Sequence, residues 1–221
     1  MHEVVDFLRL LAGHEDREWF NANKALYRSA DAVFKAFASE LIDGIAAFDD
    51  SVSGLSVADC TYRIYRDTRF SADKTPYKKH MGVFVAPHGK KAGYAGYYLH
   101  IEPDAECFLY AGLHLPSPVV LRSVREEIID NGQAIVDAID ASNGFTLSLE
   151  SQMKRTPAGF PHGHEFDYLL RLRDVGVEKA ISMDDILAED FLRRTLEDFR
   201  SISPFVKILN RAVQYAHEEM M

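Results

Sequence analysis

Apolar side chains near the amino terminus recur at every third or fourth position, which is the spacing of one helix face. The first group stops at Gly13, so we expect a short helix that ends at a residue able to adopt the left-handed conformation. Asp16 then has the side chain of a good N-cap. The stripe that follows predicts one helix over about 17–47, packed on the rest of the protein. The side chains expected to be largely buried within it include Trp19, Phe34, Phe37 and Leu41.

After residue 59 the apolar and polar positions alternate, and a period of two indicates β-strands. The connections at 87–93 and 102–105 are short and rich in turn-forming residues, so the strands beside them should pair antiparallel as hairpins. This arrangement predicts a four-stranded meander. Short hairpin connections join its last three strands, and a longer connection joins the first strand to the second. The four segments with the pattern are 60–66, 81–86, 94–101 and 106–113.

Helical spacing returns at Pro118 and, after Gly132, resumes to about residue 141. A loop rich in glycine and proline then covers 156–164. Pro204 suits the first turn of a final helix. The elements predicted beyond the loop are a helix near 166–172, a short strand near 177–181, and two helices over 189–201 and 204–217.

These elements predict an α+β fold in a single domain over residues 1–221, with a mostly antiparallel sheet flanked by helices. The helical N-terminus covers about 3–47, the sheet about 60–113, and the helical C-terminal part about 118–218. With 221 residues, 47% hydrophobic and 27% charged, the chain has the composition of an ordinary globular protein.

The net charge of −9 and the pI near 5.5 argue against broad binding of nucleic acid, which depends on neutralising many phosphates. The amino terminus lacks a basic region followed by an apolar run, and no stretch is long enough for a membrane span, so a cytoplasmic address follows by default. Cys60 and Cys107 belong to no C-x-x-C pair, and we expect two small buried strand residues and no disulfide.

The charge reverses sign between Cys60 and His80, where six Lys or Arg stand against two acidic residues. This local balance of +4 leaves −13 for the rest of the chain. Aromatic rings lie between the cations, and guanidinium groups beside aromatic faces suit planar or phosphorylated anions. One hypothesis is therefore a concave site for a small anionic ligand, with arginines as bidentate clamps and lysines as point charges. The candidate ligand-binding residues are Arg63, Tyr65, Arg66, Asp67, Arg69, Lys74, Tyr77 and Lys78.

Two other interpretations of this run stay open. In the first, the charges form a structural network in which Asp67 and Asp73 pair with Arg69 and Lys74 and fix the loop. In the second, the run docks an acidic protein or nucleic-acid partner. The prediction that separates them is that at least three of the five cations 63, 66, 69, 74 and 78 approach a common point.

The nine histidines raise the question of a metal, and the densest group is His162, His164, Glu165 and Asp167. Zinc and iron sites need three or four ligands, and this loop has no companion motif elsewhere, so we expect no metal and no cofactor. His100 and His114 could face the same sheet surface as the basic run, where a packed or hydrogen-bonded role is favoured over a general base. No phosphate loop, dinucleotide fingerprint or nucleophile elbow is found, so no catalytic residue is predicted.

The chain resembles the bacterial family called domain of unknown function 2461. Asp16 stands where members of that family often have Asn, an exchange between two good N-caps. The resemblance implies no particular activity, substrate or cofactor. It covers nearly the whole chain and rests on Trp19-Phe20, Asn23-Lys24 and Tyr27, on the segments 63–78, 93–98, 111–116 and 156–160, and on Pro204.

Overall fold

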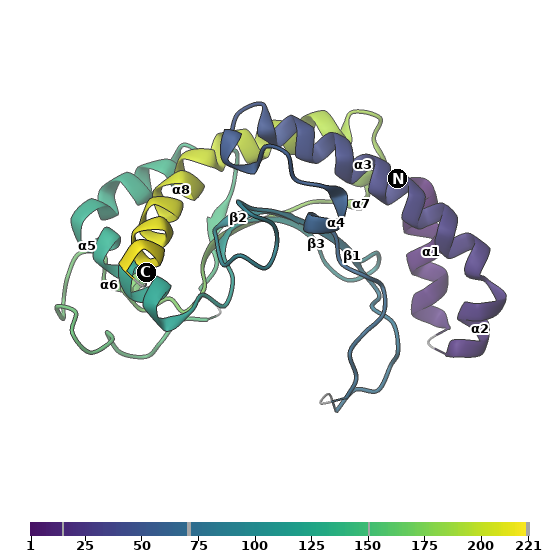
Figure 1. Cartoon of the computed structure of the whole chain (residues 1–221), viewed down its shortest axis with the longest axis horizontal. Coiled ribbons are helices and arrows are strands. Elements are labelled where there is room, and N and C mark those ends of the chain that lie inside the picture. Colours follow the sequence, from purple (N-terminus) through teal and green to yellow (C-terminus); the bar gives the residue numbers. More distant parts are fainter. Residues whose placement is uncertain (15, 70–71, 150, 220–221) are drawn as a thin grey trace.

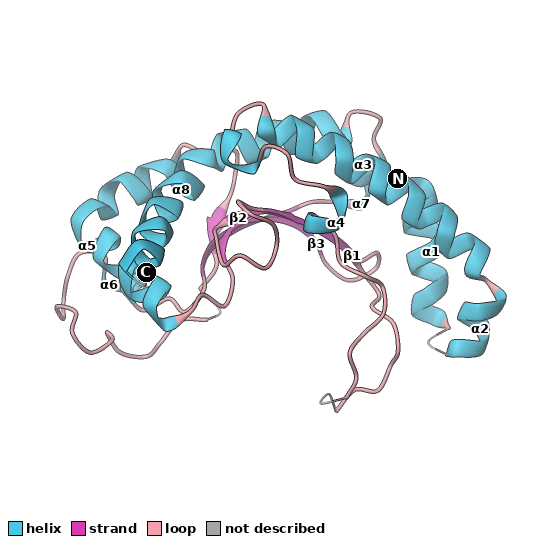
Figure 2. Ribbon diagram, in the orientation of Figure 1, coloured by secondary structure: helices cyan, strands magenta, loops and turns pink. Residues whose placement is uncertain are grey.

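The computed structural model describes residues 1–14, 16–69, 72–149 and 151–219. These residues form an α+β fold around a five-stranded antiparallel sheet with the order β1-β2-β3-β5-β4 (Figures 1 and 2). The predicted fold class is confirmed. The strands are β1 (Met81–Val85), β2 (Gly96–Ile101), β3 (Cys107–Leu113), β4 (Thr146–Leu147) and β5 (Val175–Ala180).

The three hairpin-connected strands of the predicted meander are present as β1, β2 and β3. The predicted strand at 60–66 is wrong. Cys60 ends the short helix α4 (Val57–Cys60), whose N-cap Ser56 forms a capping box with Asp59, and the chain beyond makes only isolated bridges, at Thr61 and at Tyr65. The capping box decides the local structure because it satisfies the first free N–H groups of a helix just where the alternating pattern begins.

The helix predicted over 17–47 is broken at Asn23, where φ is −105° and ψ is 20°. The backbone N–H of Asn23 and its side-chain amide both donate to the carbonyl of Trp19, each at 2.9 Å, and the first helix ends there. Asp16 caps that helix as predicted, accepting from the Trp19 N–H at 2.7 Å. The three helices are α1 (His2–Gly13), α2 (Arg17–Ala22) and α3 (Lys24–Ala46).

Burial along this stripe follows the prediction only in part. Phe34 and Leu41 are buried, as expected. Trp19 is half-buried and stacks on His14, and Phe37 is half-buried and stacks on Phe191. Both rings lie against other helices at the margin of the core, which explains why the period alone overestimated their burial.

The last helix, α8 (Phe191–Glu219), is continuous, so the predicted break before Pro204 is wrong. Proline has no N–H for the carbonyl four residues earlier, which belongs to Arg200. The hydroxyl of Ser203 donates to that carbonyl at 2.9 Å and replaces the missing bond. The other carboxy-terminal helices are α5 (Pro118–Asp140), with non-helical dihedrals at Asn131, α6 (Asp167–Leu170) and α7 (Met183–Leu187), and a 3-10 turn η1 covers Asp50–Val52.

The two faces of the sheet differ in cover. Helices α3 and α8 lie along one face (Figure 1), where Tyr97 of β2 packs on Phe199 of α8 with ring centroids 5.4 Å apart. The buried residues of this face include Val83, Leu99 and Leu109. The opposite face remains half-exposed, and we call it the open face. Its side chains include Phe84, Tyr98, His100 and Phe108.

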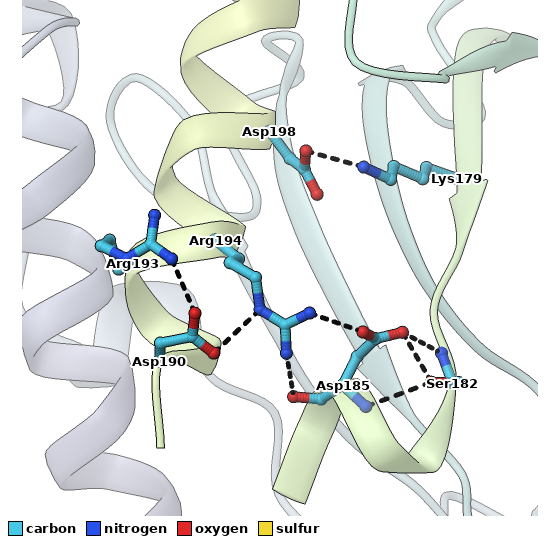
Figure 3. A network of polar contacts seen from close by, with 7 residues as sticks. All are labelled: Lys179, Ser182, Asp185, Asp190, Arg193, Arg194 and Asp198. Atoms are coloured by element: carbon cyan, nitrogen blue, oxygen red, sulfur yellow. Dashed lines mark hydrogen bonds and ion pairs between the residues drawn. The ribbon is translucent and has the colours of Figure 1, made fainter. Parts of the chain in front are cut away.

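A polar network ties the edge of the sheet to the start of α8 (Figure 3). Asp185, held by the N-cap Ser182 of α7, accepts from Arg194 at 2.7 Å, and Lys179 of β5 pairs with Asp198 at 2.7 Å. Each pair is partly exposed, so each contributes about 0.2–1 kcal/mol. The first pair joins α7 to α8, and the second joins β5 to α8. No helix in the described residues combines the length and apolar composition needed to cross a bilayer.

Candidate functional site

Residues 62–69 and 72–80 form an extended arm that leaves the β1 side of the sheet and projects away from α3 and α8 (Figure 1). Its two sides are joined by backbone hydrogen bonds, from Arg66 N to the Pro76 carbonyl at 2.9 Å and from Lys78 N to the Ile64 carbonyl at 2.8 Å. Residues 70–71 lie outside the described residues. The basic run is thus folded back on itself, and cations from its two sides become neighbours.

The base of the arm is anchored on helix α2. Tyr77 is buried and stacks on Phe20 with ring centroids 4.0 Å apart and planes at 13°. Tyr65 is 42% exposed and meets Phe20 only edge-on, at 5.7 Å. Of the two tyrosines among the candidate ligand-binding residues, Tyr77 therefore holds the arm to the protein, and Tyr65 keeps an exposed surface.

The distal charges of the arm are paired within it. Asp67 accepts from Arg69 at 3.0 and 2.6 Å, as the structural interpretation predicted. The predicted pair of Asp73 with Lys74 is wrong, because Asp73 binds Arg66 and the Lys74 ammonium donates to the Thr68 carbonyl at 2.9 Å. Asp73 also accepts from the N–H of Thr75 at 2.9 Å, a local turn that directs its carboxylate across the arm.

These contacts account for the electrostatics of the distal arm. The Thr75 N–H, followed by the Arg66 guanidinium, holds the pKa of the Asp73 carboxyl far below its usual range. Arg69 lowers the pKa of the Asp67 carboxyl in the same way. Asp67, Arg69 and Lys74 thus have partners in the arm itself, which favours a structural role for its outer part.

Cations gather at the base of the arm. The Lys78 ammonium is half-buried and lies 5.1 Å from the centre of the Tyr62 ring. Burial lowers the pKa of Lys78, and the nearby positive charges of Arg63 and Arg66 lower it further. Lys90 approaches the same ring at 5.8 Å. Three of the five cations named in the sequence analysis, Arg63, Arg66 and Lys78, therefore influence one another here. Arg69 and Lys74 contact Asp67 and Thr68 farther out along the arm.

A cluster of polar side chains continues from the arm onto the open face. His80, the last residue of the arm, lies with its Nδ1 atom 3.6 Å from a carboxylate oxygen of Glu102. The Nε2 atom of His100 lies 3.4 Å from the same oxygen, and the two imidazole rings are 4.4 Å apart. On its other side His100 shares a hydrogen bond of 2.9 Å, through Nδ1, with the hydroxyl of Tyr98.

The register of the sheet explains this convergence. Tyr98, His100 and Glu102 stand at alternate positions and therefore project to one face. Met81 pairs with Ile101, so the same register carried one residue further brings His80 opposite Glu102. The alternation could have been noticed in the sequence, but the approach of His80 follows only from the pairing of β1 with β2.

Two neighbours hold His100 in place. Phe108 of β3, directly opposite it, stacks on the imidazole with centroids 4.7 Å apart and planes at 11°. Gly82, opposite on β1, leaves room for the Tyr98 ring, since a Cβ atom at that position would lie 2.5 Å from the tyrosine hydroxyl oxygen. The His100 side chain is only 12% exposed as a result.

Burial sets the protonation of the two imidazoles. It lowers the pKa of His80 to about 4, with a further contribution from the neighbouring His100. Burial also lowers the pKa of His100, although Glu102 acts in the opposite direction. Both rings are therefore neutral near pH 7, the form in which a nitrogen lone pair is available to a proton or a cation.

The other histidines singled out by the sequence lie elsewhere. His114 is 69% exposed and lies 3.7 Å from Asp174. It follows the end of β3 that pairs with the start of β2, so of these two histidines only His100 lies beside the basic run. In the loop at 162–167, His164 accepts from the Phe166 N–H at 3.2 Å. Within the described residues, only His80, His100 and Glu102 bring three potential metal ligands together, with their ligand atoms within 4.8 Å of one another.

Three cavities described in the structure lie away from the arm. One of about 420 Å³ separates α5 from the loop at 158–161, and its walls include Arg125 and Phe160. A second of about 560 Å³ borders residues 151–158 and Arg173. A third of about 230 Å³ adjoins the network of Figure 3. None of these three is the concave site that the sequence analysis expected at the basic run.

The chain matches a family model described as "Conserved hypothetical protein (DUF2461)" over residues 3–207. Because the match covers most of the 221 residues, the chain belongs to this family, as the resemblance indicated. No curated protein and no solved structure matches the chain. The description of the family specifies no ligand or reaction, so the functional argument depends on the geometry above.

Proposed function

We propose that the protein binds a small anionic ligand, of phosphate or carboxylate type, at the base of the arm beside the open face of the sheet. The residues that would contact it are Lys78, Arg63 and Arg66, with Tyr62 forming an aromatic wall. Guanidinium groups offer paired donors to such an anion and an ammonium offers a compact charge. The proposal retains Arg63, Arg66 and Lys78 from the site predicted from the sequence. The outer residues Asp67, Arg69 and Lys74 are assigned a structural role in the arm.

The observation that carries the proposal is the environment of Lys78. Its ammonium is drawn into a half-buried position over the Tyr62 ring, next to two arginines of the same sign. Among the described residues no carboxylate lies within ion-pair distance of this ammonium. Arg66 is paired with Asp73, whereas the Lys78 ammonium has no carboxylate of its own among the described residues, and an anion placed beside it would offset the repulsion from Arg63 and Arg66.

The test is a thermal shift experiment with phosphate, sulfate and citrate, each compared with sodium chloride at the same ionic strength. Binding to the native state alone raises the melting temperature, by an amount that grows with ligand concentration. We expect a rise with the oxyanions that diminishes as salt is added. Lys78→Met should abolish this rise while retaining most of the side-chain volume, and Arg63→Gln should reduce it.

Lys154→Met is the matched control, since it removes an exposed lysine that lies beyond the arm. It should leave the oxyanion effect intact. If the parent chain shows no shift beyond that of chloride, or if Lys78→Met and Lys154→Met behave alike, the proposal is wrong. The charges at the base of the arm would then serve its structure, as the rival interpretation holds.

The exposure of the arm supports a second candidate, an interaction module for an acidic partner. Arg63, Arg69 and Lys74 are exposed, and the arm extends away from the helical layer (Figure 1). A docking surface would depend on the outer charges as much as on Lys78. Lys74→Glu discriminates between the two functions, because it should weaken docking to an acidic polypeptide yet spare the oxyanion shift.

A further inference from the structure

The cluster of His80, His100 and Glu102 lies beside the arm and needs none of its cations, so we considered it separately. Three side chains from different positions point their ligand atoms at one another, all within 4.8 Å. We propose that these residues form a binding site for a divalent transition-metal ion, with two imidazole nitrogens and one carboxylate oxygen as ligands. The inference departs from the expectation drawn from the sequence, which considered only the loop at 162–167.

The distances favour a shared ion over direct hydrogen bonds. A single oxygen of Glu102 faces two nitrogens, at 3.6 Å from His80 and 3.4 Å from His100. Hydrogen bonds between nitrogen and oxygen centre near about 2.9 Å, so both contacts are long for that interaction. Two ligands bound tetrahedrally at about 2.0–2.1 Å from one ion lie about 3.4 Å apart. The two nitrogen–oxygen separations therefore match ligands of a common ion, and the two imidazole nitrogens, within 4.8 Å of each other, would move closer on binding it.

The second nitrogen of His100 has the partner that a metal ligand requires. When Nε2 binds an ion, Nδ1 carries the proton and donates it to a neighbouring oxygen, which orients the ring. The Tyr98 hydroxyl lies 2.9 Å from Nδ1 in that position. Phe108 supports the same ring from β3 by stacking. The orientation of His100 is thus fixed by residues that do not themselves bind the ion.

The ligand set indicates the class of ion. Two imidazoles and one carboxylate suit zinc, iron(II), cobalt(II) or manganese(II), whereas calcium and magnesium prefer oxygen ligands. Three protein ligands leave coordination positions for water or for an oxygen of a small molecule. Glu102 and His80 are partly exposed, at 27% and 30% of their side chains, so an ion can reach them from solvent.

The experiment uses full-length protein made without an affinity tag and first stripped with a chelator. Cobalt(II) is added in a buffer free of phosphate and other oxyanions, and visible absorption and elemental analysis are measured. We expect one cobalt ion per chain, with an absorption band that zinc removes by competition. Glu102→Gln and His80→Ala should each weaken binding at least about tenfold, and Tyr98→Phe should weaken it less, since it acts through His100.

His114→Ala is the matched control, because it removes an exposed histidine that also lies near a carboxylate, that of Asp174. It should bind cobalt as the parent chain does. Far-UV circular dichroism of each variant establishes that the fold is retained, and either ligand variant alone suffices if the other is unstable. Absence of stoichiometric cobalt or zinc binding by the parent chain would overturn the inference, as would equal affinity in Glu102→Gln and His114→Ala.

This outcome is independent of the proposed anion site. Lys78→Met should keep its cobalt band while losing the oxyanion shift, and Glu102→Gln should do the reverse when the shift is measured after chelation. Failure of one measurement therefore leaves the other interpretable.

Discussion

Tyr77 of the arm stacks on Phe20 of α2 with ring centroids 4.0 Å apart, so a residue of the basic run is part of the hydrophobic core. This contact joins the amino-terminal helices to the base of the arm. It fixes the position of Lys78, the next residue, relative to the sheet. The position of the Lys78 side chain, which the proposed anion site needs, therefore depends on the packing of Tyr77 in the core.

Phe20→Ala should destabilise the protein by about 3–5 kcal/mol, because Phe20 is 1% exposed and its removal leaves a cavity beneath the arm. Urea unfolding followed by circular dichroism measures this loss. The variant should also be cleaved faster by trypsin within the arm. Tyr65→Ala is the comparison, since Tyr65 is exposed, and its loss should stay below about 1 kcal/mol. Equal losses in the two variants would contradict the anchoring role.

Ser203→Ala should cost about 0.5–1.5 kcal/mol, because the carbonyl of Arg200 would lose the hydroxyl that replaces the proline N–H. Denaturant unfolding of the Ser203→Ala and Pro204→Ala single variants and of the double variant tests whether the hydroxyl compensates for the proline. In a Pro204→Ala background the restored N–H can reach the same carbonyl, so the serine substitution should cost less. Additive effects of the two substitutions would show that Ser203 does not compensate for Pro204.

Gly82→Ala should displace the Tyr98 ring, since the new methyl group would lie 2.5 Å from the tyrosine oxygen. Movement of the Tyr98 ring removes the hydroxyl that partners His100 Nδ1, and it should change the nitrogen-15 NMR signals of that imidazole. Gly13→Ala is a control on the same substitution, because its Cβ would meet no atom within 4 Å. An unchanged His100 signal in Gly82→Ala would mean that Tyr98 does not orient the ring.

Cys60 should resist alkylation in the native protein. It is buried, and burial raises the pKa of its thiol to about 11. Because the thiolate is the reactive form, the rate should rise about tenfold for each pH unit up to that value. Iodoacetamide labelling followed by mass spectrometry measures it. The half-buried Cys107 should react faster at pH 8, and more rapid labelling of Cys60 would argue for local opening of α4.

Much of the fold could be predicted from the sequence, because local patterns govern it. The alternation in β1, β2 and β3 and their short turns specified an antiparallel meander, and Asp16 was correctly predicted as an N-cap. The errors fell where a single side chain outweighs the pattern. Asn23 ends a helix early, Ser203 allows one to continue through a proline, and Ser56 starts one that runs into the first residue of a predicted strand.

The sequence by itself determined that basic and aromatic residues are concentrated at 62–80 in an acidic chain, since charge and composition are local properties. Only the tertiary structure decided which of these charged side chains form ion pairs within the arm and which do not. The folding of the arm pairs Arg66 with Asp73, leaves Lys78 over Tyr62, and buries Tyr77. The pairing of β1 with β2 likewise brings His80 to Glu102, 22 positions away in the sequence. Such contacts depend on strand register, which no single segment of the chain encodes.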